Sequence, residues 1–456
     1  MRWSLIRITQ ANDRRLNVGR SLKFQLMLPP VIPLAAANAD WRLSLIAKVV
    51  DRSVFLSTPA SNIAVLGATN YIHSDGDELL SMHKHMSRSD TADVGYKRWS
   101  TDGGKTWSEP VVWPCAFDAE GGQGRRQSRG GFVDPGTGRF VSVWTVGVLP
   151  TDNPLEGFKQ WTLRYSVSDD GDRTQLVDEQ IIHAPDENGN TYDAVHHLPG
   201  VTVGRNCAMI GDYTQRPMTR SDGVILMPIQ VSPTGPDGYY HNPGRGYTYT
   251  DCQLLMGTWQ DDGRLAWRAS DRIAGDPEKT SRGLIEPTIA ELPGDRLLMV
   301  MRGSNDSADM HGWRWIAISN DGGQTWDQPR PWTYTDGGSF HSPSSCSQLV
   351  LHPSGRLFWV GNLCEQNPLG NSPRYPIVIA EVDMKTGLLI RESVTSLDDR
   401  QPGESERLTL SNFLVRVERG SGDLLLHLSR LFADPKDTAN GNVFHADAML
   451  YRIELV

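Results

Sequence analysis

The sequence predicts an all-β protein built as a six-bladed β-propeller. Three observations lead to this prediction: a composition rich in turn residues, a glycine turn that repeatedly precedes an apolar strand, and a second turn that recurs within most repeats. The 456 residues include 44 Gly, 28 Pro and 14 Trp and offer few long helical patterns. Such a chain favours many short strands joined by tight turns.

A glycine turn followed by four or more mostly apolar residues occurs six times. The copies are HSDGDELLSM, DPGTGRFVSVW, TRSDGVILMPI, LPGDRLLMVM, HPSGRLFWVG and RGSGDLLLHL, with Gly76, Gly138, Gly223, Gly294, Gly355 and Gly422 in the turns. Each copy fits a hairpin turn that leads into a buried strand. Successive glycines lie roughly 60–85 residues apart, and this spacing suits the four-stranded blade of a propeller.

A second turn, S-x-D-x-G-x-T-W, is written in full in RWSTDGGKTWSEP and in AISNDGGQTWDQP, with weaker copies around Asp170, Asp262 and Asp383. Its glycine permits positive φ, its Asp and Ser can bond backbone amides, and its Trp can pack onto the blade. Two copies in different blades would rarely both face one site. We therefore interpret Asp102 and Asp321 as scaffold residues.

The ends of the chain are expected to close the ring. The last strand, in HADAMLYRIEL, should share a blade with the segment around SVFLSTP, so the propeller is expected to span residues 46–456. Residues 1–45 are interpreted as a leader with a possible export signal, from the basic stretch ending RSLK, the apolar run FQLMLPPVIPLAAA and the small-residue site in ANAD. A disordered or edge-strand leader is the alternative. An exported chain would be periplasmic or secreted.

Charge and cysteine usage exclude several classes of partner. The 45 basic and 54 acidic residues give a net charge of −9 and are interspersed, so nucleic acid is not an expected partner. No other stretch is apolar enough to cross a bilayer, and no membrane insertion is expected. No metal or other cofactor is predicted, because the five cysteines form no ligand pattern with His. They are interpreted as buried small residues, with one bridge left open: Cys115, Cys207, Cys252, Cys346 and Cys364.

The S-x-D-x-G-x-T-W turn is the Asp box, and with it the chain resembles the sialidase superfamily of six-bladed propellers as a divergent member. The stretch EPTIAELPGDRLLMVMR resembles the sialidase segment in which a Glu begins one strand and a triad Arg ends the next. The resemblance implies that Glu286 polarises the nucleophile or acts as acid/base, and that Arg302 grips a substrate carboxylate. NPLGNSPRYPIVIAEVD resembles the segment with another triad Arg, here Arg374. Converging guanidiniums would select an anionic sugar, whereas the alternative is that each Arg pairs with a carboxylate on a blade surface.

Two stretches depart from the family pattern. VLGATNYIHSDG has no Arg where sialidases carry their first triad Arg, and RLTLSNFLVRVERG has Leu410 or its neighbours where they carry a Tyr nucleophile. That Tyr forms the covalent intermediate of the family. Ordinary sialidase chemistry would therefore require a substitute nucleophile from a distant loop.

Other clusters could contribute chemistry or bind sugar. In SMHKHMSR, His83 and His85 would point the same way on a strand, with Arg88 just beyond; rim-loop hydrogen bonding is the alternative. YDAVHHLPG and IGDYTQRPMTR bring His196, Tyr213 and Arg216 close in sequence, and GYYHNPGRGYTY adds further rings. Aromatic rings suit stacking on sugars as well as ordinary packing.

We expect a sialidase-like exo-acting glycoside hydrolase that acts on an anionic glycan of sialic- or uronic-acid type. Glu286, His83, His85 and Tyr213 are the candidate catalytic residues. Arg302, Arg374, Arg88, His196 and Arg216 are the candidate substrate-binding residues. The alternatives are a lyase, in which Arg neutralises a uronate and His or Tyr removes the C5 proton, and a glycan-binding propeller without activity. If the hydrolase interpretation holds, Glu286, Arg302 and Arg374 should converge with His83 or His85 on one cavity.

Overall fold

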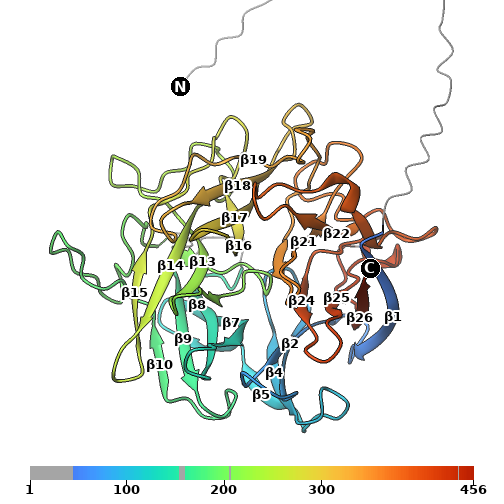
Figure 1. Ribbon diagram of the computed structural model, residues 1–456, viewed down its shortest axis with the longest axis horizontal. Coiled ribbons are helices and arrows are strands. Elements are labelled where there is room, and N and C mark those ends of the chain that lie inside the picture. Colours follow the sequence, from blue (N-terminus) through green and yellow to red (C-terminus); the bar gives the residue numbers. More distant parts are fainter. Residues whose placement is uncertain (1–44, 154–159, 205–206, 440) are drawn as a thin grey trace, which may run out of the picture. The chain divides into compact units, whose positions relative to one another are not determined.

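A computed structural model describes residues 45–153, 160–204, 207–439 and 441–456. Six antiparallel sheets make up this part of the chain, and in Figure 1 their strands follow one another around a ring. The all-β, six-bladed prediction is confirmed. Of the predicted leader, residues 1–44 lie outside the described residues.

In most blades the strands follow one another from the axis outward in chain order, whereas the outermost strand of blade 6, β1, comes from the start of the described chain. Blade 1 contains β2 (Ala64–Tyr71), β3 (Leu79–Met86), β4 (Val94–Ser100) and β5 (Val111–Pro114). Blade 2 contains β6 (Ala116–Ala119), β7 (Gly122–Val133), β8 (Phe140–Leu149), β9 (Gln160–Ser168) and β10 (Val177–Gln180). Blade 3 contains β11 (Ala208–Met209), β12 (Met218–Thr219), β13 (Ile225–Val231), β14 (Asp251–Trp259) and β15 (Leu265–Ala269). Blade 4 contains β16 (Ile285–Leu292), β17 (Arg296–Arg302), β18 (Arg314–Ser319) and β19 (Arg330–Pro331). Blade 5 contains β20 (Gln348–Leu351), β21 (Leu357–Asn362), β22 (Ile377–Val382) and β23 (Thr395–Asp398). Blade 6 contains β24 (Phe413–Val417), β25 (Leu424–Ser429), β26 (Ala448–Leu455) and β1 (Ala47–Leu56). Two short helices, η1 (Arg391–Ser393) and α1 (Lys436–Ala439), lie in connections.

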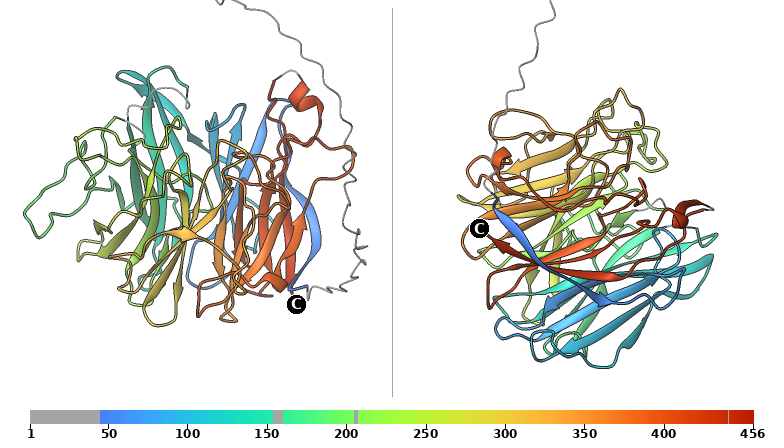
Figure 2. Two further views of the ribbon diagram at one scale, coloured as in Figure 1. Left: turned by 90° about the horizontal axis from the view of Figure 1, so that it is seen from above. Right: turned by 90° about the vertical axis from the view of Figure 1, so that its right-hand side faces the viewer.

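The ring is closed by strands from the two ends of the described chain. Strand β1 pairs with β26 in antiparallel register, with Ser53 opposite Leu450 and Val54 opposite Met449. In Figure 2 the blue β1 lies beside the red strands of the last blade. The predicted pairing of SVFLSTP with HADAMLYRIEL is therefore confirmed.

The hydrophobic core is divided among the interfaces between neighbouring blades. One cluster joins strands of blades 2 and 3, others join blades 3 and 4 or 4 and 5, and another joins blades 5 and 6. A blade strand is thus covered on both faces, and all seven residues of β13 are buried. This two-sided burial explains why the repeats read as continuous apolar runs and not as alternating ones.

The Asp-box turns serve the scaffold. The Asp102 carboxylate accepts hydrogen bonds from the Ser100 hydroxyl (2.8 Å), the Thr106 amide (2.9 Å) and the Thr106 hydroxyl (2.6 Å). Asp321 is held in the same way. The weaker copy at Asp170, which has Gln175 at the Trp position, makes the same three bonds with Ser168 and Thr174.

No helix among the described residues has both the length and the apolar character needed to cross a membrane. All five cysteines are free thiols. Cys364 is partly exposed and the other four are buried, in keeping with their interpretation as small buried residues.

Candidate functional site

A cavity of ≈ 300 Å³ lies at the axis of the ring, and residues from all six blades line it. We call it the axial cavity. An axial mouth shared by all blades is a usual place for a site in a propeller because each blade can contribute one or two side chains. Its charged lining residues are Lys84, Asp90, Arg129, Asp212, Arg282, Glu286, Arg302 and Arg374.

The Glu286 side chain lines the cavity from an irregular part of β16. The pairing of β16 with β17 shifts register between Ile285 and Thr288, and Glu286 has φ of 45°. A bulge of this kind redirects a side chain at the end of a strand. The neighbouring Gly211 leaves the space that Glu286 needs, because a Cβ at Gly211 would lie 2.5 Å from its Cγ.

A chain of hydrogen bonds crosses the floor of the cavity. Arg302 donates to Glu286 (2.7 Å), and the Cys346 thiol donates to the same carboxylate oxygen (3.2 Å). Cys346 Sγ also lies 3.7 Å from a carboxylate oxygen of Asp212, which accepts from the Asn412 amide at 2.7 Å. Four blades are linked in this way, so the relative positions of the two carboxylates are fixed by the ring as a whole.

The network keeps Glu286 ionised. Burial favours its neutral form, but the Arg302 charge and the hydrogen bonds from Arg302 and Cys346 outweigh it and lower the pKa of Glu286 to about 2. Burial and the two nearby carboxylates raise the pKa of Cys346 well above its ordinary value, so it is a neutral thiol. Within the described part of the chain no group of three His, Cys, Asp or Glu side chains is placed to hold a metal ion.

Three further guanidiniums reach the cavity without a carboxylate partner among the described residues. Arg374 donates only to the Ser344 carbonyl (3.1 Å), and its buried Nε–H has no partner. Arg282 donates to the Thr248 hydroxyl (2.7 Å), and its buried Nε–H is also unpaired. Arg129 bonds neutral acceptors. Because buried cations are normally neutralised, these groups indicate a site for an anionic ligand.

Lys84 adds a titratable base to the same cavity. Burial, with a smaller contribution from Arg129, lowers its pKa to about 8, and Asp212 partly opposes the shift. Its ammonium lies 4.9 Å from the centre of the Tyr213 ring. A lysine with a pKa near neutrality can take up or release a proton at physiological pH.

Part of the backbone strain of the described chain lies at the cavity. Eight non-glycine residues in the described chain have positive φ, and three of them, Asp90, Glu286 and Phe432, line the axial cavity. Such conformations cost of the order of 1–3 kcal/mol each and tend to occur where function requires them.

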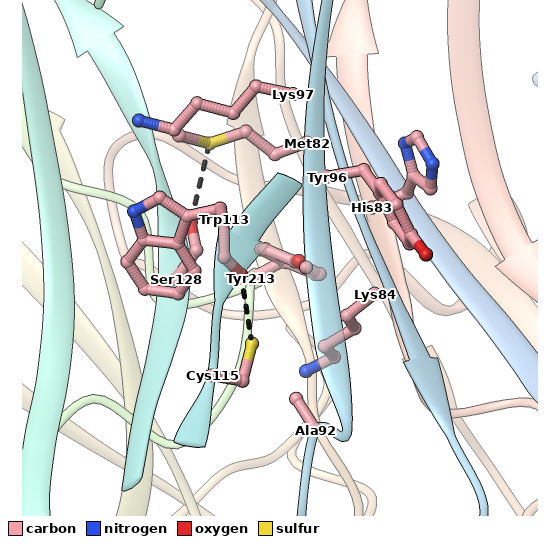
Figure 3. Close-up of a pocket in the computed structure, with 11 residues that line it drawn as sticks. Met82, His83, Lys84, Ala92, Tyr96, Lys97, Trp113, Cys115, Ser128 and Tyr213 are labelled. Carbon is pink, nitrogen blue, oxygen red and sulfur yellow. Dashed lines mark hydrogen bonds between the residues drawn. The ribbon is translucent and has the colours of Figure 1, made fainter. Parts of the chain in front are cut away.

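The structure brings together Glu286, Arg302 and Arg374 but places His83 and His85 outside the axial cavity. The two histidines do share one face of β3, as the period of two requires, with their rings 6.2 Å apart. Lys84, between them in sequence, faces the axis instead; Figure 3 shows His83 and Lys84 on opposite sides of the strand. Burial and Arg98 lower the pKa of His83 to about 3, and burial also lowers that of His85.

The remaining candidates are dispersed. Tyr213 is 3% exposed and belongs to a small apolar cluster beneath the cavity. Arg88 forms an ion pair with Asp152, which is the alternative foreseen for an isolated Arg. The His196 side chain is 74% exposed, and Arg216 lines a different cavity. His196, Tyr213 and Arg216 are close in sequence, but none of them lines the axial cavity.

The two departures from the family pattern have structural counterparts. In VLGATNYIHSDG, Leu66 lines the axial cavity with an aliphatic side chain, in the stretch where sialidases carry their first triad Arg. In the last blade, Thr409, Ser411 and Asn412 line the cavity, whereas Leu410 is fully buried in the core. The phenol at the cavity comes from Tyr247 in the blade 3 loop, and the Arg282 guanidinium lies 4.1 Å from its ring centre.

Several site residues carry no motif in the sequence. Asp90, Asp212 and Arg282 lie in loops within a few residues of a strand end, and Arg129 lies within β7. Their position in each repeat is the signal that could have identified them, since the ends of inner strands meet at one mouth. Cys346 was interpreted only as a small buried residue, yet it bonds Glu286.

Comparisons with solved structures support the fold. A protein of unknown function from Dyadobacter fermentans is similar, with a TM-score of 0.56 and 14% identity over 90% of this chain and 100% of that one. The K499G mutant of NanB sialidase from Streptococcus pneumoniae is similar with a TM-score of 0.55 and 11% identity over 90% of this chain and 70% of that one. At such identities the likeness shows the fold alone.

Sequence comparisons add the family. No curated protein sequence matches the chain. The family described as "BNR repeat-like domain" matches residues 158–406, which is more than half of the chain and extends from blade 2 into the loop after blade 5. With the six-bladed ring and its Asp boxes, this match shows that the protein belongs to the BNR repeat-like domain family, and its propeller fold is similar to that of NanB sialidase at low sequence identity.

Proposed function

We propose that the protein is an exo-acting glycoside hydrolase whose axial cavity binds a glycan through a carboxylate of its terminal sugar. The observation that supports this most directly is the convergence of Arg282, Arg302 and Arg374 on one cavity, two of them with unpaired Nε–H groups. A guanidinium pairs with a carboxylate through two parallel hydrogen bonds. The sialidase fold of the structural neighbours is consistent with an acidic sugar as substrate.

The carboxylates of the cavity can perform the hydrolysis. Glu286 is ionised at neutral pH, so it would accept a proton from the water that attacks the anomeric carbon. Asp90, in the exposed loop after β3, also lines the cavity. In its protonated form it would donate a proton to the leaving oxygen, so that one water is added across the cleaved bond. Two carboxyl groups on either side of a sugar are the usual arrangement for glycoside hydrolysis.

A second candidate reaction, β-elimination from a uronate, is favoured by Lys84. Its pKa of about 8 suits the removal of the C5 proton, which the arginines would acidify by neutralising the carboxylate. His83 and His85 are less suited to this role because they lie outside the cavity and their pKa values are lowered.

The experiment is mass spectrometry of products after incubation with sialylated and uronate-containing oligosaccharides, and with neutral oligosaccharides as controls. Hydrolysis gives product pairs that together contain one added water. Elimination gives pairs with no added water and an unsaturated sugar that absorbs in the ultraviolet. Cleavage of the neutral sugars alone would contradict both reactions as proposed.

A matched set of variants links the activity to the cavity. Glu286→Gln should abolish hydrolysis, whereas Lys84→Met should abolish elimination. Arg356→Gln, which changes a blade-surface arginine paired with Glu381, should leave turnover unchanged. If Glu286→Gln retains the wild-type rate while folded, Glu286 has no catalytic role.

A further inference from the structure

A second cavity, of ≈ 190 Å³, lies at the opposite ends of the inner strands. Strand β2 contributes Leu66 to the axial cavity and, further along, Asn70 and Tyr71 to this second one. In the same way, Asn412 of the axial cavity precedes β24, and Arg416 near the end of β24 lines the second cavity. We call it the distal cavity.

An apolar partition separates the two cavities. Ala68 and Leu414 lie midway along β2 and β24 and pack with Tyr213 in one buried cluster. None of the three lines either the axial or the distal cavity. A ligand in the distal cavity would therefore not share contacts with a substrate in the axial cavity.

Three arginines line the distal cavity, and none of its lining residues is acidic. Arg216, Arg416 and Arg419 form no ion pair among the described residues. Their side-chain hydrogen bonds within the described part of the chain all go to neutral oxygens. Arg216 donates to Asn70 Oδ1 (3.1 Å) and to the Gly131 carbonyl (3.3 Å). Arg416 donates to the hydroxyls of Thr69 (2.9 Å) and Tyr71 (3.0 Å). Arg419 donates to the carbonyls of Gly76 and His73 (2.8 Å each).

The nearest carboxylate in sequence is already engaged. Glu418 accepts from Arg452 at 2.5 and 3.0 Å. Arg416 is only 8% exposed, and burial together with the charge of Arg416 lowers the pKa of Arg216 to about 10. Cations that approach each other in a buried site destabilise the fold unless an anion compensates them.

Two neutral donors complete the lining. Asn70 is 2% exposed, and its side-chain Nδ2 has no hydrogen-bond partner among the residues that the structure describes. The Tyr71 hydroxyl accepts bonds from Arg416 and from the Arg419 amide, so its own proton remains to be donated. A buried amide nitrogen without an acceptor calls for a ligand atom or a water.

We propose that the distal cavity binds a tetrahedral oxyanion, phosphate or sulfate, between the guanidiniums of Arg216, Arg416 and Arg419. Three guanidiniums and two neutral donors offer more N–H and O–H groups than the two oxygens of a carboxylate can accept. An ion with four oxygens suits this number of donors better. Because Asn70 belongs to blade 1, Arg216 to blade 3 and Arg416 to blade 6, the ion links three blades. This proposal does not depend on the glycosidase activity.

The test is calorimetric titration of the full-length protein with sodium phosphate and sodium sulfate at constant ionic strength. We expect saturable binding of one ion per chain. Arg419→Gln removes an exposed guanidinium, and Asn70→Asp places a carboxylate in the cavity at constant size, so each should weaken binding at least tenfold. The matched control is Arg391→Gln. Arg391 is exposed and lies over a tyrosine ring (4.0 Å), as Arg419 lies over that of Tyr71 (3.9 Å), but it is paired with Asp336. This variant should bind as wild type.

One further variant distinguishes the two cavities. Arg374→Gln should retain ion binding, since Arg374 lines only the axial cavity. The proposal is overturned if the wild-type protein shows no saturable binding, or if Arg374→Gln abolishes binding while Arg419→Gln retains it. A parallel titration with glucose 6-sulfate identifies the source, because tighter binding than for sulfate would indicate an esterified ion and weaker binding a free one.

Discussion

Among the arginines of this protein, those with a carboxylate partner and those without one should respond oppositely to substitution. Arg302 compensates Glu286 in a buried ion pair, whereas Arg374 is held by one carbonyl. Breaking a buried pair leaves an uncompensated charge, but removing an unpaired cation relieves a desolvation penalty. An arginine that serves to bind a ligand is therefore expected to be one whose substitution does not lower the free energy of unfolding.

For Arg374→Gln we predict a loss of affinity for acidic substrates with no loss of stability. Two charge-assisted hydrogen bonds to a carboxylate would be lost, about 3 kcal/mol in all, so kcat/KM should fall roughly a hundredfold. Thermal unfolding should occur at or above the wild-type temperature. Steady-state kinetics and calorimetry measure both quantities, and Arg302→Gln is the contrasting variant that should unfold earlier. A marked destabilisation by Arg374→Gln would instead give Arg374 a structural role.

The Glu286–Arg302 pair also predicts a pH dependence of stability. Since the pKa of Glu286 falls from 4.5 to about 2 on folding, its contribution is complete above pH 4.5 and is lost as the pH falls toward 2. Glu286→Gln should lower the free energy of unfolding by about 3–5 kcal/mol at pH 7, and the difference from wild type should shrink below pH 4.5. Urea unfolding of both proteins between pH 7 and pH 3 measures it. A difference that stays constant over this range would contradict the lowered pKa.

At the scale of strands and turns, the sequence predicted what depends on local chemistry. The six glycine turns lead into β3, β8, β13, β17, β21 and β25, because a positive φ and an apolar run are both local signals. The phase of a strand relative to the axis was not predictable in the same way. Alternation placed His83 and His85 on one face, but which face meets the axis is set by the neighbouring blades, and Lys84 took that position.

The Asp boxes allow a prediction for a single turn. Asp321→Ala removes the acceptor for the Ser319 hydroxyl and for the Thr325 amide and hydroxyl, and should lower the free energy of unfolding by roughly 1–3 kcal/mol. Turnover should be unchanged because Asp321 does not line the axial cavity.

The control for this variant is Asp262→Ala, in a turn at the comparable place of blade 3. The Asp262 carboxylate bonds only the amide and guanidinium of Arg264, so its loss should affect stability less. Chemical denaturation of the two variants side by side compares the turns. Equal effects would mean that the Ser and Thr hydrogen bonds of the Asp box add nothing.

At the scale of the whole molecule, the site depends on ring closure. Asp212 and Asn412 are separated by 200 positions and share a hydrogen bond of 2.7 Å. No sequence pattern in either segment indicates that the two residues are neighbours. Sequence reasoning found Glu286, Arg302 and Arg374 because each lies in a stretch that resembles the family. Asp212 and Cys346 lie in no such stretch, and their partners at the axis come from other blades, so only their position near a strand end could have indicated them.

Closure by β1 can be tested with two adjacent residues that face opposite ways. Ala47 is 2% exposed and belongs to the cluster that joins the last two blades, whereas the next residue, Lys48, is exposed. Ala47→Asp would bury an unpaired carboxylate and should lower the free energy of unfolding by several kcal/mol, while Lys48→Asp should have little effect. Because the axial cavity draws on all six blades, the loss of closure should reduce activity and the thermal unfolding temperature together. If Ala47→Asp unfolds at the same temperature as Lys48→Asp, the β1–β26 pairing does not hold the ring closed, and the inner strands alone must keep the site assembled.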